Sequence, residues 1–410
     1  MMWQKGVFTG LFILLNLFAQ PINAQKDSIP EEVPETFFPE IKWNDIIRIS
    51  GYTQVRYNGL FETNPDLKCD QCDKSWGGGN NGFFFRRIRI KFAGNVHEKV
   101  YFYIQPDFAS SPGGGNQQFA QIRDAYFDLA LDKKKEFRFR IGQSKVPFGF
   151  ENMQSSQNRL PLDRHDGLNS AVKNERDIGI FFYWAPDHVR KRFASLSKKG
   201  LKHSGDYGMF GLGVYNGQTA NVFELNNSQH VVTRFSYPFE FANGQIFEPG
   251  IQAYTGQFVL PNVTEGVTVN DDYEYLDQRA AVSAVLYAQP FGIQAEYNIG
   301  RGPEYIPETN SIEMRDLHGG YATLTYRFQI QRQVFFPFAR YHYYKGGKKH
   351  ERDATKHRVS ELEVGMEWQP IKNFELVAMY TFSDRTFENA LNPINRQIGS
   401  LLRLQLQLNF

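Results

Sequence analysis

The stretch LLRLQLQLNF, residues 401–410, alternates apolar and polar side chains up to the end of the chain. Leucines stand at every second position from 402 to 408, and the polar residues between them are Arg403, Gln405, Gln407 and Asn409. Successive side chains of a β-strand point to opposite faces, so this strand has one apolar and one polar face. Such a strand fits the wall of a barrel that meets lipid outside and water inside. A soluble edge strand is the alternative.

The same period of two recurs along the chain and predicts about sixteen strands between residues 46 and 410. Clear examples are IIRISGYTQVRY (46–57), FRRIRIKFAG (85–94), EFRFRIGQ (136–143) and YATLTYRF (321–328). The chain is also rich in residues typical of β structure and turns, with 37 Phe, 21 Tyr and 35 Gly. No stretch after the N-terminus is apolar enough for a transmembrane helix. An all-β protein is therefore expected.

Short and long links alternate between these predicted strands. Short links fall at 94–99, 131–135, 241–245, 289–292, 329–333 and 369–373, and long ones at 58–82, 145–175, 256–273, 299–317, 344–356 and 383–396. Outer-membrane barrels have short periplasmic turns at one end and long extracellular loops at the other. A soluble sandwich or propeller is not expected to alternate in this way. The link at 186–206 should be short and is long, so a strand could be miscounted there.

These patterns predict a transmembrane antiparallel β-barrel with long extracellular loops. Every backbone N–H and C=O in lipid needs a partner, so the last strand must pair with the first. The terminal Phe410 resembles the signal by which outer-membrane barrels are recognised for assembly, which implies the barrel assembly machinery as a partner. The surroundings of such a barrel are outer-membrane lipid and lipopolysaccharide.

The N-terminus carries a secretory pattern. Residues 1–24 combine Lys5, an apolar run at 7–19 and a cleavage site before Gln25, as signal peptides do. A membrane anchor is the alternative, but the run is shorter than the roughly 20 residues that a spanning helix needs. Residues 25–45 are rich in Pro and Glu and are expected to be a periplasmic lead-in to a barrel at 46–410. The sequence thus predicts the outer membrane of a Gram-negative-type bacterium.

Cations occupy the polar faces of two predicted strands. They are Arg87, Arg89 and Lys91 on one strand and Arg138 and Arg140 on another. A cation facing lipid at the membrane midplane costs about 2–4 kcal/mol, so these side chains should point into the barrel. There they could guide anions, because guanidinium groups bind oxyanions through a planar fork of donors. Alternatively, they pair with carboxylates and stiffen the wall.

The link that starts at Lys145 is long for a connection, and long loops are often functional. Its Phe148 and Phe150 could anchor it against the inner wall, which would place four cations at the narrowest point: Lys145, Arg159, Arg164 and Lys173. A loop that covers the mouth is the alternative. The basic link at 345–358 could attract anions, contact lipopolysaccharide phosphates, or simply be solvated.

The two cysteines, Cys69 and Cys72, lie in one predicted extracellular loop. An oxidising compartment favours a disulfide between them over a redox or metal site. The glycine-rich segments lack the Lys-Ser/Thr of a phosphate-binding loop. No catalytic constellation stands out, so neither an enzyme nor a cofactor or metal is expected. An outer-membrane lipase would need a hydroxyl and a histidine side by side, which spacing alone cannot reveal.

Five segments together resemble the phosphate-selective porin O and P family. They are GYTQVRY (51–57), FFFRRIRIKFAG (83–94), RDAYFDL (123–129), IGQSKVPFGFE (141–151) and FGLGVYNG (210–217). The resemblance implies a sixteen-stranded barrel, usually a homotrimer, whose anion-selective pore is narrowed by an inward-folded loop. In that family, phosphate selectivity depends on an arginine ladder and constriction lysines. Here, several lumen-facing acids weigh against strict phosphate selectivity: Asp124, Asp128, Glu296, Glu361 and Glu363.

The resulting hypothesis is an outer-membrane porin that passes small hydrophilic solutes and prefers anions such as phosphate. A barrel with a plugged lumen, used for binding or anchoring, is the alternative. Nucleic acid is not an expected partner.

Overall fold

The computed structural model describes residues 46–67, 82–110 and 118–410. All of them belong to one compact unit, 43–410. The predicted signal peptide, the lead-in and the CDQC segment with Cys69 and Cys72 lie outside the described residues.

Strands dominate the described chain. Their bounds are β1 (Arg48–Leu60), β2 (Phe83–His97), β3 (Val100–Ser110), β4 (Phe119–Ala130), β5 (Phe137–Lys145), β6 (Arg176–Trp184), β7 (Phe210–Tyr215), β8 (His230–Ser236), β9 (Phe239–Glu240), β10 (Ile246–Val259), β11 (Glu274–Leu286), β12 (Phe291–Ile306), β13 (Ser311–Tyr326), β14 (Phe328–Ile330), β15 (Gln333–Gly347), β16 (Lys356–Ile371), β17 (Phe374–Asn389) and β18 (Asn392–Asn409). The helices are α2 (Phe150–Met153), α3 (Asp166–Asn169), α4 (Asp187–Lys198) and the 3-10 turn η1 (Arg352–Ala354).

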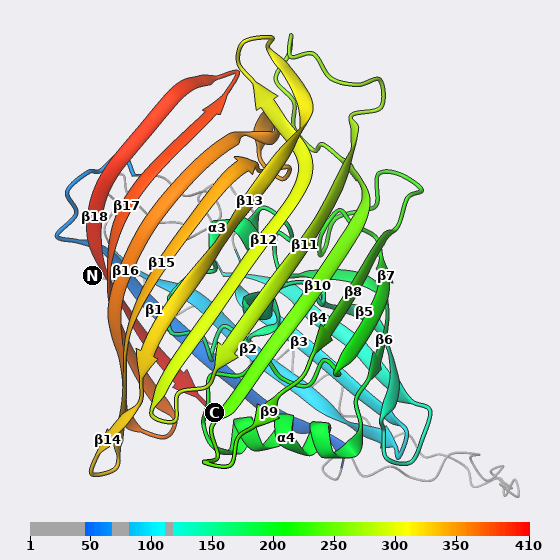
Figure 1. Ribbon diagram of the computed structural model, residues 1–410, viewed down its shortest axis with the longest axis vertical. Helices are drawn as coiled ribbons and strands as arrows, with labels where there is room; N and C mark the ends of the chain where they lie inside the picture. Colours follow the sequence, from blue (N-terminus) through cyan, green and yellow to red (C-terminus); the bar gives the residue numbers. More distant parts are fainter. Residues whose placement is uncertain (1–45, 68–81, 111–117) are drawn as a thin grey trace, which may run out of the picture. The chain divides into compact units, whose positions relative to one another are not determined.

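These strands form one closed antiparallel sheet (Figure 1). The short β9 continues β8 along β10, and β14 continues β13 along β15, so the described residues make a barrel of sixteen strands. β18 pairs with β1 and closes the barrel. The last pairing joins Gly51 and Phe410, whose N–H groups donate to each other's carbonyls at 2.7 and 3.0 Å. The predicted fold class and strand number are confirmed.

The alternation in the last strand separates an outer and an inner face. Leu404, Leu406 and Leu408 are 37, 40 and 49% exposed, whereas Arg403 and Gln407 are 1 and 2% exposed inside the barrel. Leucine on the outside meets lipid at no cost, and the polar groups find partners in the lumen. No helix among the described residues is long and apolar enough to cross a membrane.

Three links between strands differ from the lengths that the sequence predicted. The link that breaks the alternation, between β6 and β7, contains α4 and no additional strand, so the strand count was right. Two expected long loops, 299–317 and 383–396, are instead hairpins in which pairing continues to Ile306–Ser311 and Asn389–Asn392. These outer strand ends have lost the apolar alternation, which is why the sequence indicated loops.

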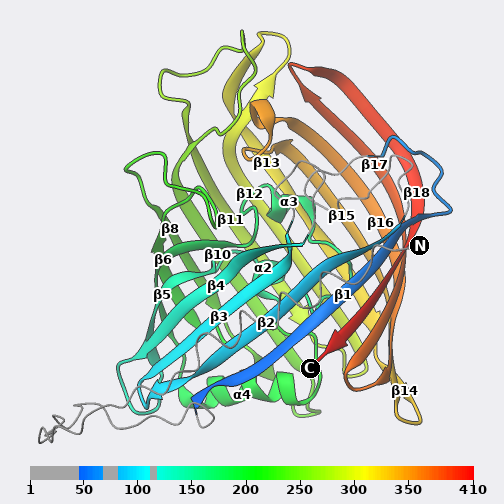
Figure 2. The same cartoon turned by 180° about the vertical axis from the view of Figure 1, so that it is seen from behind.

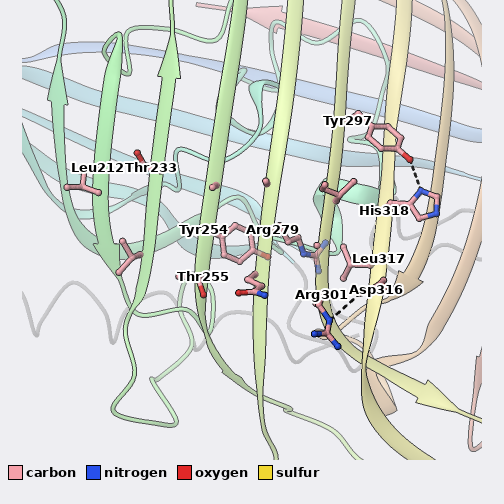
Figure 3. Close-up of a pocket in the computed structure, with 16 residues that line it drawn as sticks. Leu212, Thr233, Tyr254, Thr255, Arg279, Tyr297, Arg301, Asp316, Leu317 and His318 are labelled. Atoms are coloured by element: carbon pink, nitrogen blue, oxygen red, sulfur yellow. Dashed lines mark hydrogen bonds and ion pairs between the residues drawn. The ribbon is translucent and has the colours of Figure 1, made fainter.

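The wall is uneven in height (Figures 1 and 2). β7 and β8 have 6 and 7 residues, whereas β12, β13, β16 and β17 have 16 each. A groove of about 800 Å³ crosses the outer face from β7 to β13, between Leu212 on one side and His318 on the other (Figure 3). Its outer rim carries the ion pair Arg301–Asp316. This groove is outside the lumen and so does not belong to a path through the barrel.

Candidate functional site

The link between β5 and β6, residues 146–175, runs through the inside of the barrel (Figure 2). We call it the inner loop. Phe148 and Phe150 are 0 and 1% exposed. The ring of Phe148 meets Tyr254 of β10 edge-on at 4.7 Å, in one apolar cluster with Leu168 of α3. Burial of a phenylalanine contributes roughly 1.5–3 kcal/mol, so these rings hold the loop inside, the course expected from them.

Lys145 fixes the start of the inner loop. Its Nζ donates to the backbone oxygens of Asn152 and Gln154, both at 2.8 Å, at the end of α2. The turn into α2 needs Gly149, whose φ is 81° and where a Cβ would lie 2.6 Å from Cδ1 of Leu168. The ammonium group of Lys145 is therefore engaged by the loop itself.

One side of the inner loop is tied to β1 and β18. Arg56 donates to the backbone oxygen of Leu162 at 2.6 Å and lies 3.3 Å from Asp163. Arg403 of β18 also pairs with Asp163. The hydroxyls of Tyr52 and Ser156 are 2.6 Å apart. These contacts hold the middle of the loop against the wall where the barrel closes.

The opposite side is tied to β15, β16 and β17. Arg340 lies between Glu151 of the loop, at 2.8 Å, and Glu363 of β16, at 2.5 Å. Asp166 of α3 receives Arg385 of β17 at 2.8 Å and Lys348 at 2.5 Å. The inner loop is thus fastened to both sides of the barrel.

Asp166, His342 and Glu361 are the residues in the described part of the chain with the spacing of metal ligands, all within 4.8 Å. Arg385 contacts both carboxylates, at 2.8 Å from Asp166 and 2.6 Å from Glu361. Because cations already neutralise these carboxylates, the arrangement favours an ion-pair network over a metal centre.

The basic link between β15 and β16 folds over α3 instead of reaching outward. Lys348 and Lys349 are 1 and 2% exposed. Lys349 lies 2.6 Å from Asp277 of β11, and Lys348 lies 2.5 Å from Asp166 of α3. These two lysines are therefore engaged inside the barrel, and a contact of the link with lipopolysaccharide phosphates stays a prediction for its other basic residues.

The three cations predicted on β2 face the lumen but have different partners. Arg89 is paired with Asp107 at 2.7 Å and donates to the hydroxyl of Tyr52 at 2.8 Å. Lys91 donates to Oε1 of Gln157 in the inner loop at 2.5 Å. Arg87 donates to Oε1 of Gln54 at 2.7 Å, and its Nε has no hydrogen-bond partner among the described residues.

Arg138 and Arg140 on β5 also face the lumen, and both are paired. Arg138 contacts Asp206 at 2.8 Å. Arg140 makes two bonds to Asp128, at 2.8 and 2.9 Å, and its guanidinium lies 3.9 Å from the ring centre of Tyr126. Both arginines thus have carboxylate partners, as the second interpretation of these cations expected.

The loop cations gather around Glu175, at the start of β6. Arg164 and Arg159 lie 3.4 and 3.6 Å from its carboxylate, and Arg176 pairs with it as well. Arg164 also donates to Oδ1 of Asn152 at 2.8 Å, whereas Nε and Nη1 of Arg159 have no hydrogen-bond partner in the described structure. Lys173 lies at the outer end of the loop, partly exposed and next to His350.

Several buried guanidinium groups in the described structure keep a donor to spare, and Arg87 and Arg159 are two of them. Arg87 and Arg159 are 4 and 5% exposed, and the charge of Arg159 acts on Arg87 together with those of Arg56 and Arg89. Arg87 comes from the wall and Arg159 from the inner loop, so the folded loop creates a cationic spot that neither segment has alone. An oxyanion could accept hydrogen bonds from these unused N–H groups.

Several residues that shape this site were missed in the sequence. Arg56 and Arg176 follow the same alternation as the predicted cations and could have been found by it. The carboxylates Asp163, Asp166 and Glu175 lie in a loop without periodicity. Their partners are up to 240 residues away in the chain, as for Arg403 and Asp163, so spacing gave no signal for them.

The sequence profile of the phosphate-selective porin O and P family matches residues 70–410. No curated protein matches the chain. Solved structures with a similar fold include the outer-membrane channel DcaP of Acinetobacter baumannii, with a TM-score of 0.56 and 14% identity over 89% of this chain and 97% of that one.

Two more barrels are similar in fold. The trimer form of OmpT of Vibrio cholerae has a TM-score of 0.55 and 9% identity, and covers 89% of this chain and 100% of its own. An anion-selective porin from Comamonas acidovorans has a TM-score of 0.54 and 9% identity, over 89% of this chain and 99% of its own. Identities this low establish the shared barrel fold only.

Proposed function

Because this chain belongs to the phosphate-selective porin O and P family, we propose that it lets small hydrophilic anions diffuse passively through the outer membrane. Family and fold make it an outer-membrane porin, a channel rather than an enzyme. The proposed preference for anions depends on the side chains that line the lumen.

The observation that carries this proposal is the pair Arg87 and Arg159. Most lumenal cations are neutralised by a carboxylate within 4 Å, as Arg89 is by Asp107. Arg87 has only an amide partner, and Arg159 has unused donors beside a carboxylate that it shares with Arg164 and Arg176. An anion that loses part of its hydration shell at the constriction can replace it with these N–H groups.

Lys91 extends the cationic spot along β2. It is two strand positions from Arg89 and four from Arg87, and neighbouring positions on one face are about 6–7 Å apart. Its only described side-chain hydrogen bond is to Gln157. Several moderate sites in a row suit transport better than one tight site, which would retain the solute.

Oxyanions such as phosphate are the proposed solutes, because a guanidinium binds two of their oxygens at once. The test is the chloride current of the purified protein in planar bilayers while phosphate is added. Inhibition of the current at low phosphate concentration is expected. Unchanged chloride current would leave a general anion porin and remove phosphate as a preferred solute.

A plugged barrel for binding or anchoring remains a second candidate, favoured by the number of ties that hold the inner loop across the lumen. Single-channel recording separates the two. A porin gives stepwise conductance, whereas correctly folded protein that leaves bilayers silent would be plugged.

We further propose a homotrimer, as described for OmpT of Vibrio cholerae in its trimer form. Assembly through the barrel assembly machinery, contact with lipopolysaccharide and removal of residues 1–24 belong to the same proposal. Mass spectrometry of the protein extracted from outer membranes would give both the oligomeric state and the mature N-terminus, expected at Gln25.

A further inference from the structure

The link between β6 and β7 lies at the end of the barrel where the other links are short turns. Two other links at that end, between β2 and β3 and between β16 and β17, leave two residues each. This link holds α4 and then residues 199–209, which we call the strap. Figure 1 shows α4 lying across the same end of the barrel as β9 and β14. Short turns mark the periplasmic end of bacterial barrels.

α4 is fixed to the barrel rim by one apolar face. Val189, Phe193 and Leu196 recur at helical spacing and are 0, 3 and 0% exposed. They share a cluster with Ile246 and Tyr287, from the β9–β10 and β11–β12 ends of the wall. The helix is therefore a docked element that gives the strap a firm starting point.

The strap then reaches the far wall. Nζ of Lys202 lies 2.5 Å from Glu367 of β16 and 3.7 Å from Glu375 of β17. In the closed order of sixteen strands, β16 is eight strands from β6, and β17 is eight strands from β7, in either direction. A link that joins β6 to β7 and is tied to β16 and β17 must cross the full width of the lumen.

The strap also touches the inner loop from below. Nε2 of Gln154, just after α2, donates to the backbone oxygen of Lys202 at 2.9 Å. On its return the strap is held by Asp206, which lies 2.8 Å from Arg138 and 3.0 Å from Arg190. Tyr207 then meets Tyr183 edge-on at 6.0 Å before β7 begins. The strap is thus fixed at both ends and in the middle.

We infer that the strap forms a second constriction, in series with the inner loop, and that the tie from Lys202 to Glu367 and Glu375 sets its width. Solutes that have passed the inner loop must go around this segment to reach the periplasm. The inference goes beyond the proposed anion preference and rests on the proposed function only in that the barrel conducts.

We expect the strap to select solutes by size and not by charge, because its own charged side chains are paired with opposite charges. Lys202 is paired with carboxylates, and Asp206 with arginines. The two arginines outweigh burial and hold the pKa of Asp206 below its usual range. Burial and the nearby Lys202 lower the pKa of His203 to about 4, so that ring is neutral at pH 7.

The test removes the tie without changing the net charge. Lys202→Met with Glu367→Gln deletes one positive and one negative charge together. We expect the single-channel conductance to rise about twofold, because flow follows the open width of a pore. Liposomes that contain the variant should also swell in larger neutral sugars than the parent admits. The control is Lys191→Met with Asp187→Asn, an exposed pair on the outer side of α4 that should change neither result.

A second variant keeps the test decisive if the first folds poorly. Lys202→Cys with Glu375→Cys, in a background of Cys69→Ser and Cys72→Ser, is measured before and after linking with a bis-maleimide. Linking should return the conductance to that of the parent. Equal conductance and equal sugar limits in all proteins would overturn the second constriction. Because the sugars are neutral, either result stands whatever ion the pore prefers.

Discussion

At the scale of residues, buried ion pairs position the inner loop. Asp163 is the clearest case, since Arg56 of β1 and Arg403 of β18 both form ion pairs with it. All three side chains are at most 7% exposed. Each guanidinium is costly to bury alone, and one carboxylate shared between strands at the barrel seam compensates both.

Asp163→Ala should therefore destabilise the barrel, by about 3–5 kcal/mol if both arginines stay buried. The measurement is thermal unfolding in detergent, followed by the loss of the folded band on a gel. The matched control is Asp384→Ala, because Asp384 and Arg396 form a solvent-exposed pair, and such pairs contribute little to stability. Equal unfolding temperatures for the two variants would show that the loop does not depend on this tie.

The same residues show what could be predicted from the sequence. A period of two identified which arginines point inward, because a cation cannot face lipid cheaply. The period of two could not show that Arg89 has a carboxylate partner and that Arg87 has only an amide partner. That difference depends on Asp107, which β3 brings beside Arg89 through antiparallel pairing. Charge partners across strands follow from register, and register is not visible in one sequence.

At the scale of elements, the last strand closes the barrel through Phe410. Its backbone exchanges two hydrogen bonds with Gly51, and its ring occupies the space above that glycine, where a Cβ would lie 2.6 Å from the ring. The terminal residue thus completes the seam with β1, in addition to its proposed part as an assembly signal.

Deletion of Phe410 should lower the amount of folded barrel in the outer membrane while secretion into the periplasm continues. Gly51→Val is the companion variant. Its side chain would collide with the backbone oxygen of Arg89 on β2 and with the Phe410 ring, so it should weaken the pairing of β1 with both β2 and β18. The measurement is the folded fraction in purified outer membranes. If the deletion variant shows the same folded fraction as the parent, Phe410 is needed neither for assembly nor for closing the barrel.

The strap predicts a pH effect. The pKa of His203 is lowered to about 4 in the folded chain, mainly by burial, against about 6.5 for a free histidine. Between these values the released strap binds more protons than the docked one, so the docked state loses stability as the pH falls from 6.5 toward 4. Conductance should rise over this window in the parent and not in His203→Gln. The same rise in both proteins would assign it to another group.

Element boundaries also show where sequence reasoning ended. The period of two located all sixteen strands, because lipid imposes one apolar face on each crossing. It failed for 299–317 and 383–396, where strands continue beyond the membrane and the apolar face is no longer required. It gave no account of α4, whose helical period is hidden in a link expected to be a turn.

At the scale of the whole molecule, three segments from different parts of the chain occupy the lumen. The inner loop crosses it, the β15–β16 link covers α3, and the strap crosses at the periplasmic end. The sequence predicted the first of these from two phenylalanines. The other two could not be predicted, because they depend on lysines that meet distant carboxylates inside the barrel. Lys348 and Lys349 are buried there, and Lys202 is half-buried.

The central claim is that arginines with unused hydrogen-bond donors inside this barrel select anions. Arg87 and Arg159 are the groups that should matter most, since Arg87 has only an amide partner and Arg159 shares one carboxylate with Arg164 and Arg176. Arg140 and Arg340, by contrast, each have a carboxylate at 2.8 Å or less. Screening shortens from about 10 Å at 0.1 M salt to about 3 Å at 1 M, so the preference should weaken as salt rises.

The most direct measurement is the reversal potential in a potassium chloride gradient. The parent should favour chloride, and Arg87→Gln with Arg159→Gln should shift the potential toward potassium. Arg301→Gln, on the outer rim of the groove in Figure 3, should leave it unchanged. A parent pore that already favours potassium would contradict the claim, because the lumenal carboxylates would then outweigh the arginines.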